Sequence, residues 1–118
     1  MISLKESILT STGSGRSAVG LGEYKIGMIM SAPFMYSSRH NYWYEIVGVK
    51  GKATIIVRRL AERIVRSDGY NQNGESEPVL GEYWGEPFNA RLDKRGHLKI
   101  EGRYAQEWSG KPEPFYTD

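Results

Sequence analysis

Residues 42–60, YWYEIVGVKGKATIIVRRL, constrain the fold of this chain more than any other segment. Aromatic and β-branched residues dominate two runs, and such residues suit the pleated, half-buried surface of a strand. The runs are joined by Lys50-Gly51-Lys52, where glycine can adopt the positive φ that a tight reversal needs. The segment therefore predicts a β-hairpin, which we expect at the centre of a small barrel or curled sheet.

A second hairpin is predicted over residues 89–101, NARLDKRGHLKIE. Asp93 and Gly96 occupy the first and fourth places of its turn, as a type I turn prefers. Leu98 and Ile100 alternate with polar residues after the turn, which is the pattern of a strand with one buried face. Two hairpins and a chain of 118 residues with 14 glycines indicate a mostly β fold. We expect a small SH3-like barrel or a curled antiparallel sheet.

The domain organisation is simple. Residues 23–118 are expected to form a single β-barrel-like domain, because a chain of this length fits one domain. Residues 1–22 read as an N-terminal arm, with a short helix over 2–9 and a Gly- and Ser-rich loop over 10–22.

The remaining segments give weaker signals. Residues 24–34 predict a first strand, which Pro33 ends or confines to a sheet edge. Residues 58–67, RRLAERIVRS, fit a helix by the four-residue spacing of their apolar side chains, and fit equally a strand that continues past a bulge. We favour the strand.

The polar stretches and the C-terminal region are expected to lack long strands. Residues 35–41 and 68–77 read as a turn and a surface loop, and residues 78–88 as irregular structure with short strand pieces. In the tail, Pro112 and Pro114 are expected to prevent regular structure.

Composition argues against several classes of function. The chain has no cysteine, which excludes disulfide scaffolds and thiol nucleophiles and is compatible with a cytoplasmic location. His40 and His97 lie outside any metal-ligand spacing, so we expect no metal and no cofactor. The run Gly13-Ser14-Gly15-Arg16-Ser17 resembles the end of a phosphate-binding loop, but Thr10 stands where its first glycine belongs. We expect no catalytic residues, no enzyme activity and no membrane association.

Charge is distributed unevenly along the chain. Residues 1–66 carry 10 Lys or Arg and 4 Asp or Glu, whereas residues 67–118 carry 6 and 10. The first part therefore has a net charge of +6 and the second of −4, which sum to the +2 of the whole chain. Such asymmetry can mark a surface for nucleic acid or an acidic partner. It can equally disappear when the two halves interleave in one fold.

Basic and aromatic residues of the central hairpin form the best functional candidate. Small β-barrels bind single strands by neutralising phosphates with Lys and Arg and by stacking bases on aromatic rings. Alternatively, the aromatic residues pack in the core while the arginines keep an edge strand soluble. The candidate nucleic-acid-binding residues are Tyr42, Trp43, Lys50, Lys52, Arg58, Arg59, Arg63 and Arg66.

Four segments within residues 24–116 share a sequence pattern with known proteins: YKIGMIM (24–30), YWYEIVGV (42–49), IIVRRL (55–60) and YAQEWSGKP (104–112). On these segments the chain resembles a small family of uncharacterised proteins found in phages and other mobile elements. The sequence departs from the family pattern at Met28, where an acidic residue is usual, and over residues 36–41. The resemblance implies a genomic context and supplies no catalytic residues.

Two functional classes follow as hypotheses. The first is a non-enzymatic accessory protein that binds single-stranded nucleic acid. The second is a protein-interaction module that engages a host protein or self-associates, because Met28, Met30 and Met35 could offer an adaptable apolar surface.

Overall fold

The computed structural model describes residues 24–68 and 73–117. Within these ranges the chain forms eleven strands and no helix, arranged as an antiparallel sheet. The predicted mostly β fold, in its form of a curled antiparallel sheet, is confirmed. The helix and the Gly- and Ser-rich loop expected over residues 1–22 lie outside the described residues.

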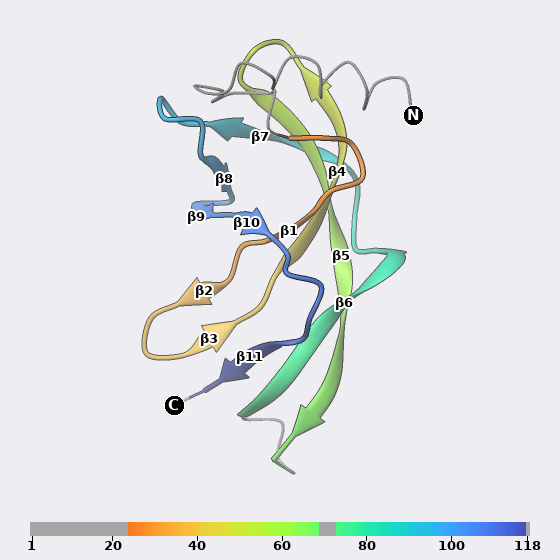
Figure 1. Ribbon diagram of the computed structural model, residues 1–118, viewed down its shortest axis with the longest axis vertical. Helices are drawn as coiled ribbons and strands as arrows, with labels where there is room; N and C mark the ends of the chain where they lie inside the picture. The colour runs from red at the N-terminus through yellow and green to blue at the C-terminus, as the bar shows by residue number, and fades with distance from the viewer. Residues whose placement is uncertain (1–23, 69–72, 118) are drawn as a thin grey trace.

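Figure 1 shows the strands along a molecule measuring 47 by 27 by 25 Å. In chain order they are β1 (Ile29–Ser31), β2 (Phe34–Met35), β3 (Arg39–His40), β4 (Trp43–Lys50), β5 (Thr54–Ser67), β6 (Asn73–Tyr83), β7 (Phe88–Leu92), β8 (Leu98–Ile100), β9 (Arg103–Tyr104), β10 (Gln106–Glu107) and β11 (Glu113–Tyr116).

Strand β5 is long enough to take part in two sheets. Its first half pairs with β4 on one side and β7 on the other, and this sheet continues to β1 and β10 and to β8 and β9. Its second half pairs with β6, and this sheet continues through β11 and β3 to β2. We call the first sheet the curled lobe and the second sheet the second lobe. They occupy the upper and lower parts of Figure 1.

The curled lobe bends until both of its ends reach the same short segment, residues 103–107. At one end Tyr104 pairs with Lys99 of β8, and the Ala105 N–H donates to the Leu98 carbonyl at 2.9 Å. At the other end Gln106 of β10 pairs with Ser31 of β1. The curvature encloses an apolar core formed by Met30, Ala32, Tyr44, Ile46, Ile55, Val57, Ala90, Leu92, Leu98 and Ile100.

Both predicted hairpins are present and line this core. In the central hairpin, β4 and β5 pair from Tyr44 opposite Arg59 to Lys50 opposite Thr54. In the second hairpin, Leu92 pairs with Leu98, and the Gly96 N–H donates to the Asp93 carbonyl at 3.0 Å. Alternation along each strand directs the branched side chains inward and the charged ones outward.

The second lobe is held together by polar groups. Asn41, which is 4% exposed, donates from Nδ2 to the Ser76 hydroxyl at 3.0 Å and to the carbonyls of Glu113 and Pro114 at 3.1 Å. The Glu113 carboxylate accepts hydrogen bonds from Ser31 at 2.8 Å and from Arg39 at 2.9 Å. These bonds connect β1, β3, β6 and β11, and they add to the apolar packing of the buried Leu60 and Phe115 side chains in this lobe.

Several expectations for the second lobe are wrong. The expected turn over residues 35–41 contains the short hairpin β2–β3, and most of the expected strand over 24–34 is turn or irregular. The expected loop and irregular stretch over 68–88 contain β6, and the tail forms β11 despite Pro114. A proline has no N–H to donate to a neighbouring strand. Pro114 is tolerated because β11 pairs with β3 only at Tyr116, so the edge of β11 that faces β3 is unpaired at Pro114.

Residues 58–67 are strand, so the favoured alternative is confirmed. The register of β5 against β6 shifts between Leu60 and Ala61, which pair with Tyr83 and Val79. The extra residues belong to β6, where Gly81, with a φ of 87°, allows the chain to bulge outward. At the other end of β6 the backbones approach closely, because a Cβ on Gly74 would lie 2.0 Å from the Arg66 carbonyl oxygen.

Candidate nucleic-acid interface

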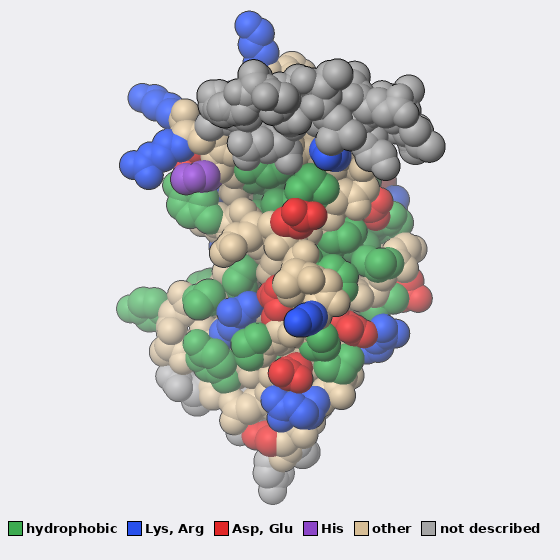
Figure 2. Space-filling model, viewed as in Figure 1, with side chains coloured by type: hydrophobic (Ala, Val, Ile, Leu, Met, Phe, Trp, Pro, Cys, Tyr) green, Lys and Arg blue, Asp and Glu red, His purple; other side chains and the backbone are tan. Residues whose placement is uncertain are grey.

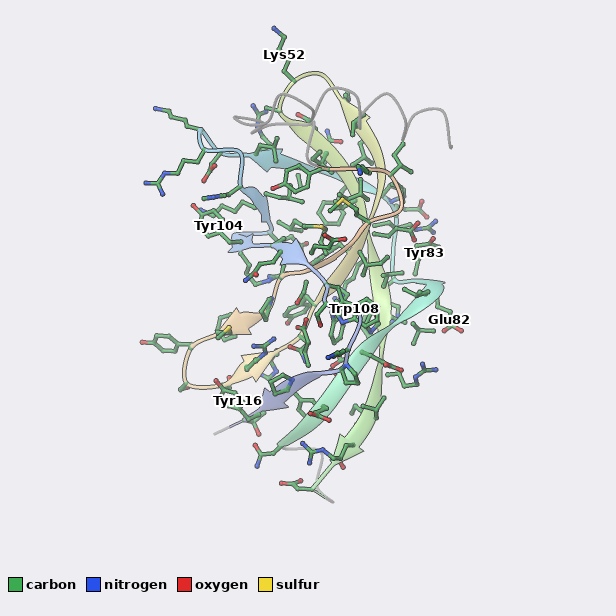
Figure 3. All side chains as sticks on the ribbon, viewed as in Figure 1. Lys52, Glu82, Tyr83, Tyr104, Trp108 and Tyr116 are labelled. Carbon is green, nitrogen blue, oxygen red and sulfur yellow. The ribbon has the colours of Figure 1, made fainter. Side chains whose placement is uncertain are left out.

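The eight predicted binding residues do not form a single patch. Lys50 and Lys52 lie at the turn between β4 and β5, and Figure 3 places Lys52 at the upper end of the molecule. Arg66 lies near the far end of β5, in the second lobe. At about 3.3 Å per residue, the twelve steps from Thr54 to Arg66 span about 40 Å. Lys50 and Lys52 are therefore separated from Arg66 by most of the length of the molecule.

Two of the predicted arginines are engaged by aromatic rings. The Arg59 guanidinium lies over the rings of Tyr42 and Trp84, with its Cζ 4.7 and 4.6 Å from their centroids. The Arg58 guanidinium lies 4.3 Å from the centroid of Tyr83, and its Nε donates to the Gly85 carbonyl at 2.8 Å. Such cation–π contacts hold the cations against the protein surface.

The two predicted stacking residues are also committed to the fold. Trp43 is 1% exposed, so its ring is not available to a base and this prediction is wrong. Tyr42 is half-buried, and the guanidinium groups of Arg59 and Arg103 both contact its ring, at 4.7 and 4.2 Å. The central hairpin therefore supplies no free stacking platform from this pair.

The remaining predicted arginines face carboxylates of β6. Arg63 lies opposite Glu77 in register and makes an ion pair with it at 2.5 Å. Arg66 lies opposite Glu75, at 3.5 Å. Both pairs are solvent-exposed, and each offsets a positive charge that a phosphate would otherwise meet.

A different set of cations is exposed at one end of the curled lobe. They lie on the β4–β5 turn, on the β7–β8 turn and on the outward faces of β7 and β8. Within residues 24–68 and 73–117 none of these side chains forms an ion pair with an acidic residue. Figure 2 shows Lys and Arg side chains extending from this end. We call this set the basic end: Lys50, Lys52, Arg91, Lys94, Arg95 and Lys99.

The sheet register places part of the basic end in a row. Lys50 pairs with Thr54, Thr54 with Arg91, Arg91 with Lys99, and Lys99 with Tyr104. Residues directly opposite each other on antiparallel strands share a face, so this row crosses β4, β5, β7, β8 and β9 on the outside of the curled lobe.

Tyr104 gives the basic end an accessible aromatic ring. It is 55% exposed, and the Lys99 Nζ lies 5.2 Å from its ring centroid. The His97 ring meets it edge-on at 6.1 Å. A hollow of about 420 Å³ beside this ring is lined by Asp93, Lys94, Arg95, His97 and Tyr104.

The carboxylate of Asp93 lies within this basic surface and serves the turn. It accepts the backbone N–H groups of His97 and Arg95 at 2.9 and 2.8 Å. The bond from His97 is the main cause that lowers the pKa of Asp93 below its ordinary value. The charge of Asp93 thus stabilises the turn that presents Lys94 and Arg95.

A buried tyrosine of the curled-lobe core, Tyr44, lies opposite Arg59, near the point where β5 passes from one sheet to the other. The Tyr44 hydroxyl donates to the Glu101 carboxylate at 2.7 Å and accepts a hydrogen bond from Arg103. Burial, followed by the bond to Glu101, raises the pKa of Tyr44 well above its ordinary value. This arrangement fixes Arg103, which also donates from Nε to the Ala32 carbonyl at 2.7 Å, as a structural cation.

Sequence reasoning identified Lys50 and Lys52 of the basic end and missed its other members. Lys94 and Arg95 lie within the predicted type I turn, so their exposure could have been inferred from the turn itself. The proximity of Arg91, Lys99 and Tyr104 to Lys50 depends on long-range pairing, for which the sequence gives no local signal. The basic end draws on both halves of the chain, so their opposite net charges are mixed in space.

No cluster of three or more His, Asp or Glu side chains in the described part of the chain could hold a metal ion. The described residues also contain no helix that could cross a membrane.

Comparison of the chain with models of known protein families, with curated proteins and with solved structures gives no match. The resemblance to phage and mobile-element proteins therefore stays a prediction.

Proposed function

We propose that this protein is a non-enzymatic binding module that binds nucleic acid through the basic end. The observation that carries the proposal is the contrast between two groups of cations. The arginines of β5 are engaged by rings or by carboxylates, whereas the six cations of the basic end are exposed and make no ion pair within the described residues. Among these six, Lys99 also lies beside a ring, that of Tyr104. Unpaired cations are free to replace the counterions of a phosphate backbone.

The exposed Tyr104 favours nucleic acid over other polyanions. A flat ring beside lysine and arginine meets the two demands of single-strand binding, which are stacking on bases and contact with phosphates. As part of the same proposal, we place the protein in the cytoplasm and among the accessory proteins of phages or other mobile elements. The lack of cysteine supports the location, and the sequence resemblance supports the context.

The proposal is tested by measuring the affinity for an oligothymidylate across a salt series. We expect the logarithm of the association constant to fall linearly with the logarithm of the salt concentration, by about 0.7 for each phosphate contacted. A Lys94→Gln, Arg95→Gln double variant should reduce that slope by about 1.4. These positions are exposed in a turn, so the fold should be retained.

The matched control is an Arg63→Gln, Arg66→Gln double variant, which removes the same net charge from the other lobe. Because both arginines already face glutamates, we expect little change in slope or affinity. Equal losses in the two double variants would contradict the assignment to the basic end. Affinity independent of salt would contradict nucleic-acid binding altogether.

A second candidate function is protein interaction, which the outer edge of the second lobe favours. Among residues 24–68 and 73–117, β2 pairs only with β3, so these residues leave its other edge open, and it exposes Phe34 and Met35. Tyr36, in the adjoining turn, is 85% exposed. An open strand edge with large apolar side chains is a site for pairing with another chain.

Sedimentation velocity over a range of protein concentrations tests this candidate. Self-association through the edge should weaken in a Met35→Ser, Tyr36→Ser double variant, and oligothymidylate binding should be unaffected. A wild-type protein that stays monomeric at every concentration would count against pairing between two copies.

A further inference from the structure

The row of residues across the curled lobe indicates how a nucleic-acid strand would lie on it. The row runs without interruption through five positions joined by four direct pairings, from Lys50 to Tyr104. Neighbouring strands are about 4.8 Å apart, so the row is about 19 Å long. It runs perpendicular to the strands and brings together residues that are 54 positions apart at its two ends.

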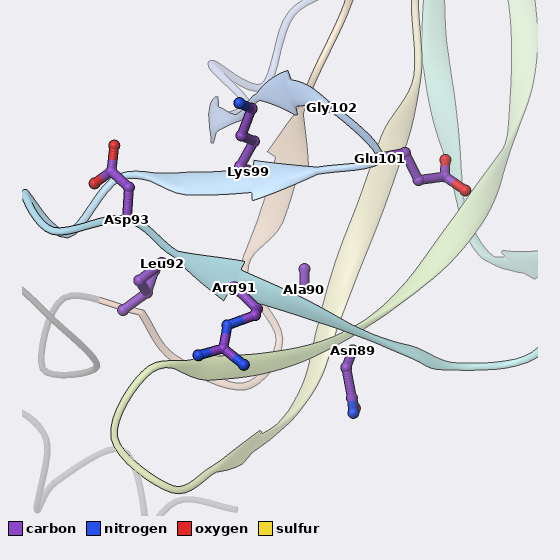
Figure 4. Close-up of a pocket in the computed structure, with 8 residues that line it drawn as sticks. All are labelled: Asn89, Ala90, Arg91, Leu92, Asp93, Lys99, Glu101 and Gly102. Carbon is purple, nitrogen blue, oxygen red and sulfur yellow. The ribbon is translucent and has the colours of Figure 1, made fainter.

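Two cations in the middle of the row are placed where an anion would stabilise them. Arg91 and Lys99 lie directly opposite each other on β7 and β8, and like charges in that arrangement destabilise a sheet. Figure 4 shows their side chains extending away from one another, with Lys99 on the side of Gly102. They border a hollow of about 350 Å³ over β7 and β8. Each cation can therefore contact a separate phosphate at the border of this hollow, which the acidic residues Asp93 and Glu101 also line.

The aromatic ring at the end of the row sets a further requirement. Tyr104 is 55% exposed and lies beside Lys99, whose Nζ is 5.2 Å from the ring centroid. A base can stack on such a ring only if it is not enclosed in a duplex. The ring therefore discriminates between single strands and double strands, whereas the cations alone would not.

We propose that the row binds a segment of single-stranded DNA or RNA that lies across the β-strands, an inference that rests on the proposed function. Its phosphates contact Lys50, Arg91 and Lys99 along the row, Lys94 and Arg95 of the adjoining turn contact phosphates beside it, and a base at one end stacks on Tyr104. A length of about 19 Å corresponds to about six nucleotides at the 3.4 Å rise of one DNA strand, and to fewer in a more extended strand.

The length of the site is tested with oligothymidylates of about three, six and twelve nucleotides at one low salt concentration. Affinity should rise steeply up to about six nucleotides and then increase only by the number of equivalent positions on the longer strand. A duplex of about twelve base pairs should bind more weakly than the single strand of the same length.

Tyr104 is tested by replacement with leucine and with phenylalanine. Tyr104→Leu should lower the affinity for the six-nucleotide strand by about 5- to 150-fold, the loss of one base–aromatic stack, and Tyr104→Phe should retain it. Lys99→Gln should reduce the salt slope by about 0.7. Lys111→Gln is the matched control, because it removes an exposed lysine that lies outside the row.

The outcomes separate this inference from the proposed function. If single strands and duplexes bind equally and Tyr104→Leu matches the wild type, the path across the strands is overturned while nucleic-acid binding stands. If affinity continues to rise steeply beyond about six nucleotides, the length of the site is overturned. If the wild type binds neither single strand nor duplex at low salt, the proposed function fails and this inference with it.

Discussion

The two lobes share β5 but are stabilised in different ways. The curled lobe closes around ten buried side chains, most of them aliphatic. The second lobe relies on Asn41, Ser76, Arg39 and Glu113, and it leaves large apolar side chains on its surface. A single strand thus runs from a large apolar core into a lobe where a buried hydrogen-bond network accompanies a smaller set of buried apolar side chains, Leu60 and Phe115. The difference teaches that strand formation alone says little about how strongly a region is held.

The largest expected difference between the lobes comes from one substitution made at two places on β5. Ile55 is fully buried in the curled lobe, whereas Ile64 is 46% exposed in the second lobe. Ile55→Ala should reduce the free energy of unfolding by about 2–5 kcal/mol, and Ile64→Ala by less than about 1 kcal/mol. Urea denaturation of both variants measures the contrast. Similar losses would show that the surface of the second lobe is covered by a partner, such as a second copy.

The polar network of the second lobe is broken by Asn41→Ala. The substitution removes the Asn41 partner of the Ser76 hydroxyl, of two carbonyl groups and of the Arg39 Nε, at a cost of about 1–3 kcal/mol, while Arg39 keeps its ion pair with Glu113. Amide hydrogen exchange should accelerate in β3 and β11 and stay unchanged in β7 and β8. Asn89→Ala, at an exposed position of β7, is the control. Uniform acceleration in all four strands would show that the lobes unfold as one unit.

The contribution of the buried Tyr44 hydroxyl to stability is tested through its dependence on pH. Because burial and the bond to Glu101 raise its pKa in the folded state, the unfolded state loses this proton first as the pH rises. The stability that Tyr44 contributes is therefore complete below pH of about 10 and declines above it. Tyr44→Phe should cost about 1 kcal/mol at neutral pH and make the alkaline decline shallower.

Thermal unfolding at a series of pH values from neutral to alkaline measures this effect. Tyr36→Phe is the control, since Tyr36 is 85% exposed. A decline of the same steepness in Tyr44→Phe and in the wild type would contradict the assignment to Tyr44.

The smallest expected effect concerns the cross-strand ion pair of the second lobe. Arg63→Gln removes the exposed pair with Glu77 and should cost less than about 1 kcal/mol, with a smaller cost at high salt. Arg66→Gln, whose pair is longer at 3.5 Å, should cost less still. A loss above about 2 kcal/mol for either variant would place these pairs among the main stabilising contacts of the second lobe.

The sequence was sufficient where local pairing determines the structure. Both hairpins of the curled lobe join strands across short turns, and alternation together with Gly51 and Gly96 identified them. Residues 58–67 of the second lobe were predicted as strand, but its other strands, β2, β3, β6 and β11, were missed because prolines and polar residues interrupt their alternation. Their pairing partners, such as Arg39 and Tyr116, lie far apart in the sequence.

The candidate site was only partly predictable for the same reason. Clustering in sequence pointed to the arginines of β5, but a strand spreads consecutive residues along its length and onto alternate faces. The row at the basic end arises from register across five strands, and only its first two residues, Lys50 and Thr54, lie within residues 42–60, the segment that composition had singled out.

The pairing of early strands with late ones has a consequence for synthesis. Met30 of β1 pairs with Glu107 of β10, and Arg39 of β3 pairs with Tyr116 of β11, a separation of 77 residues in each case. At about 5–20 residues per second, a ribosome needs about 4–15 s to produce that interval. The central hairpin is complete at Leu60, 47 residues before Glu107, so for about 2–9 s of this interval it has emerged without the segment that completes the curled lobe and is open to chaperones.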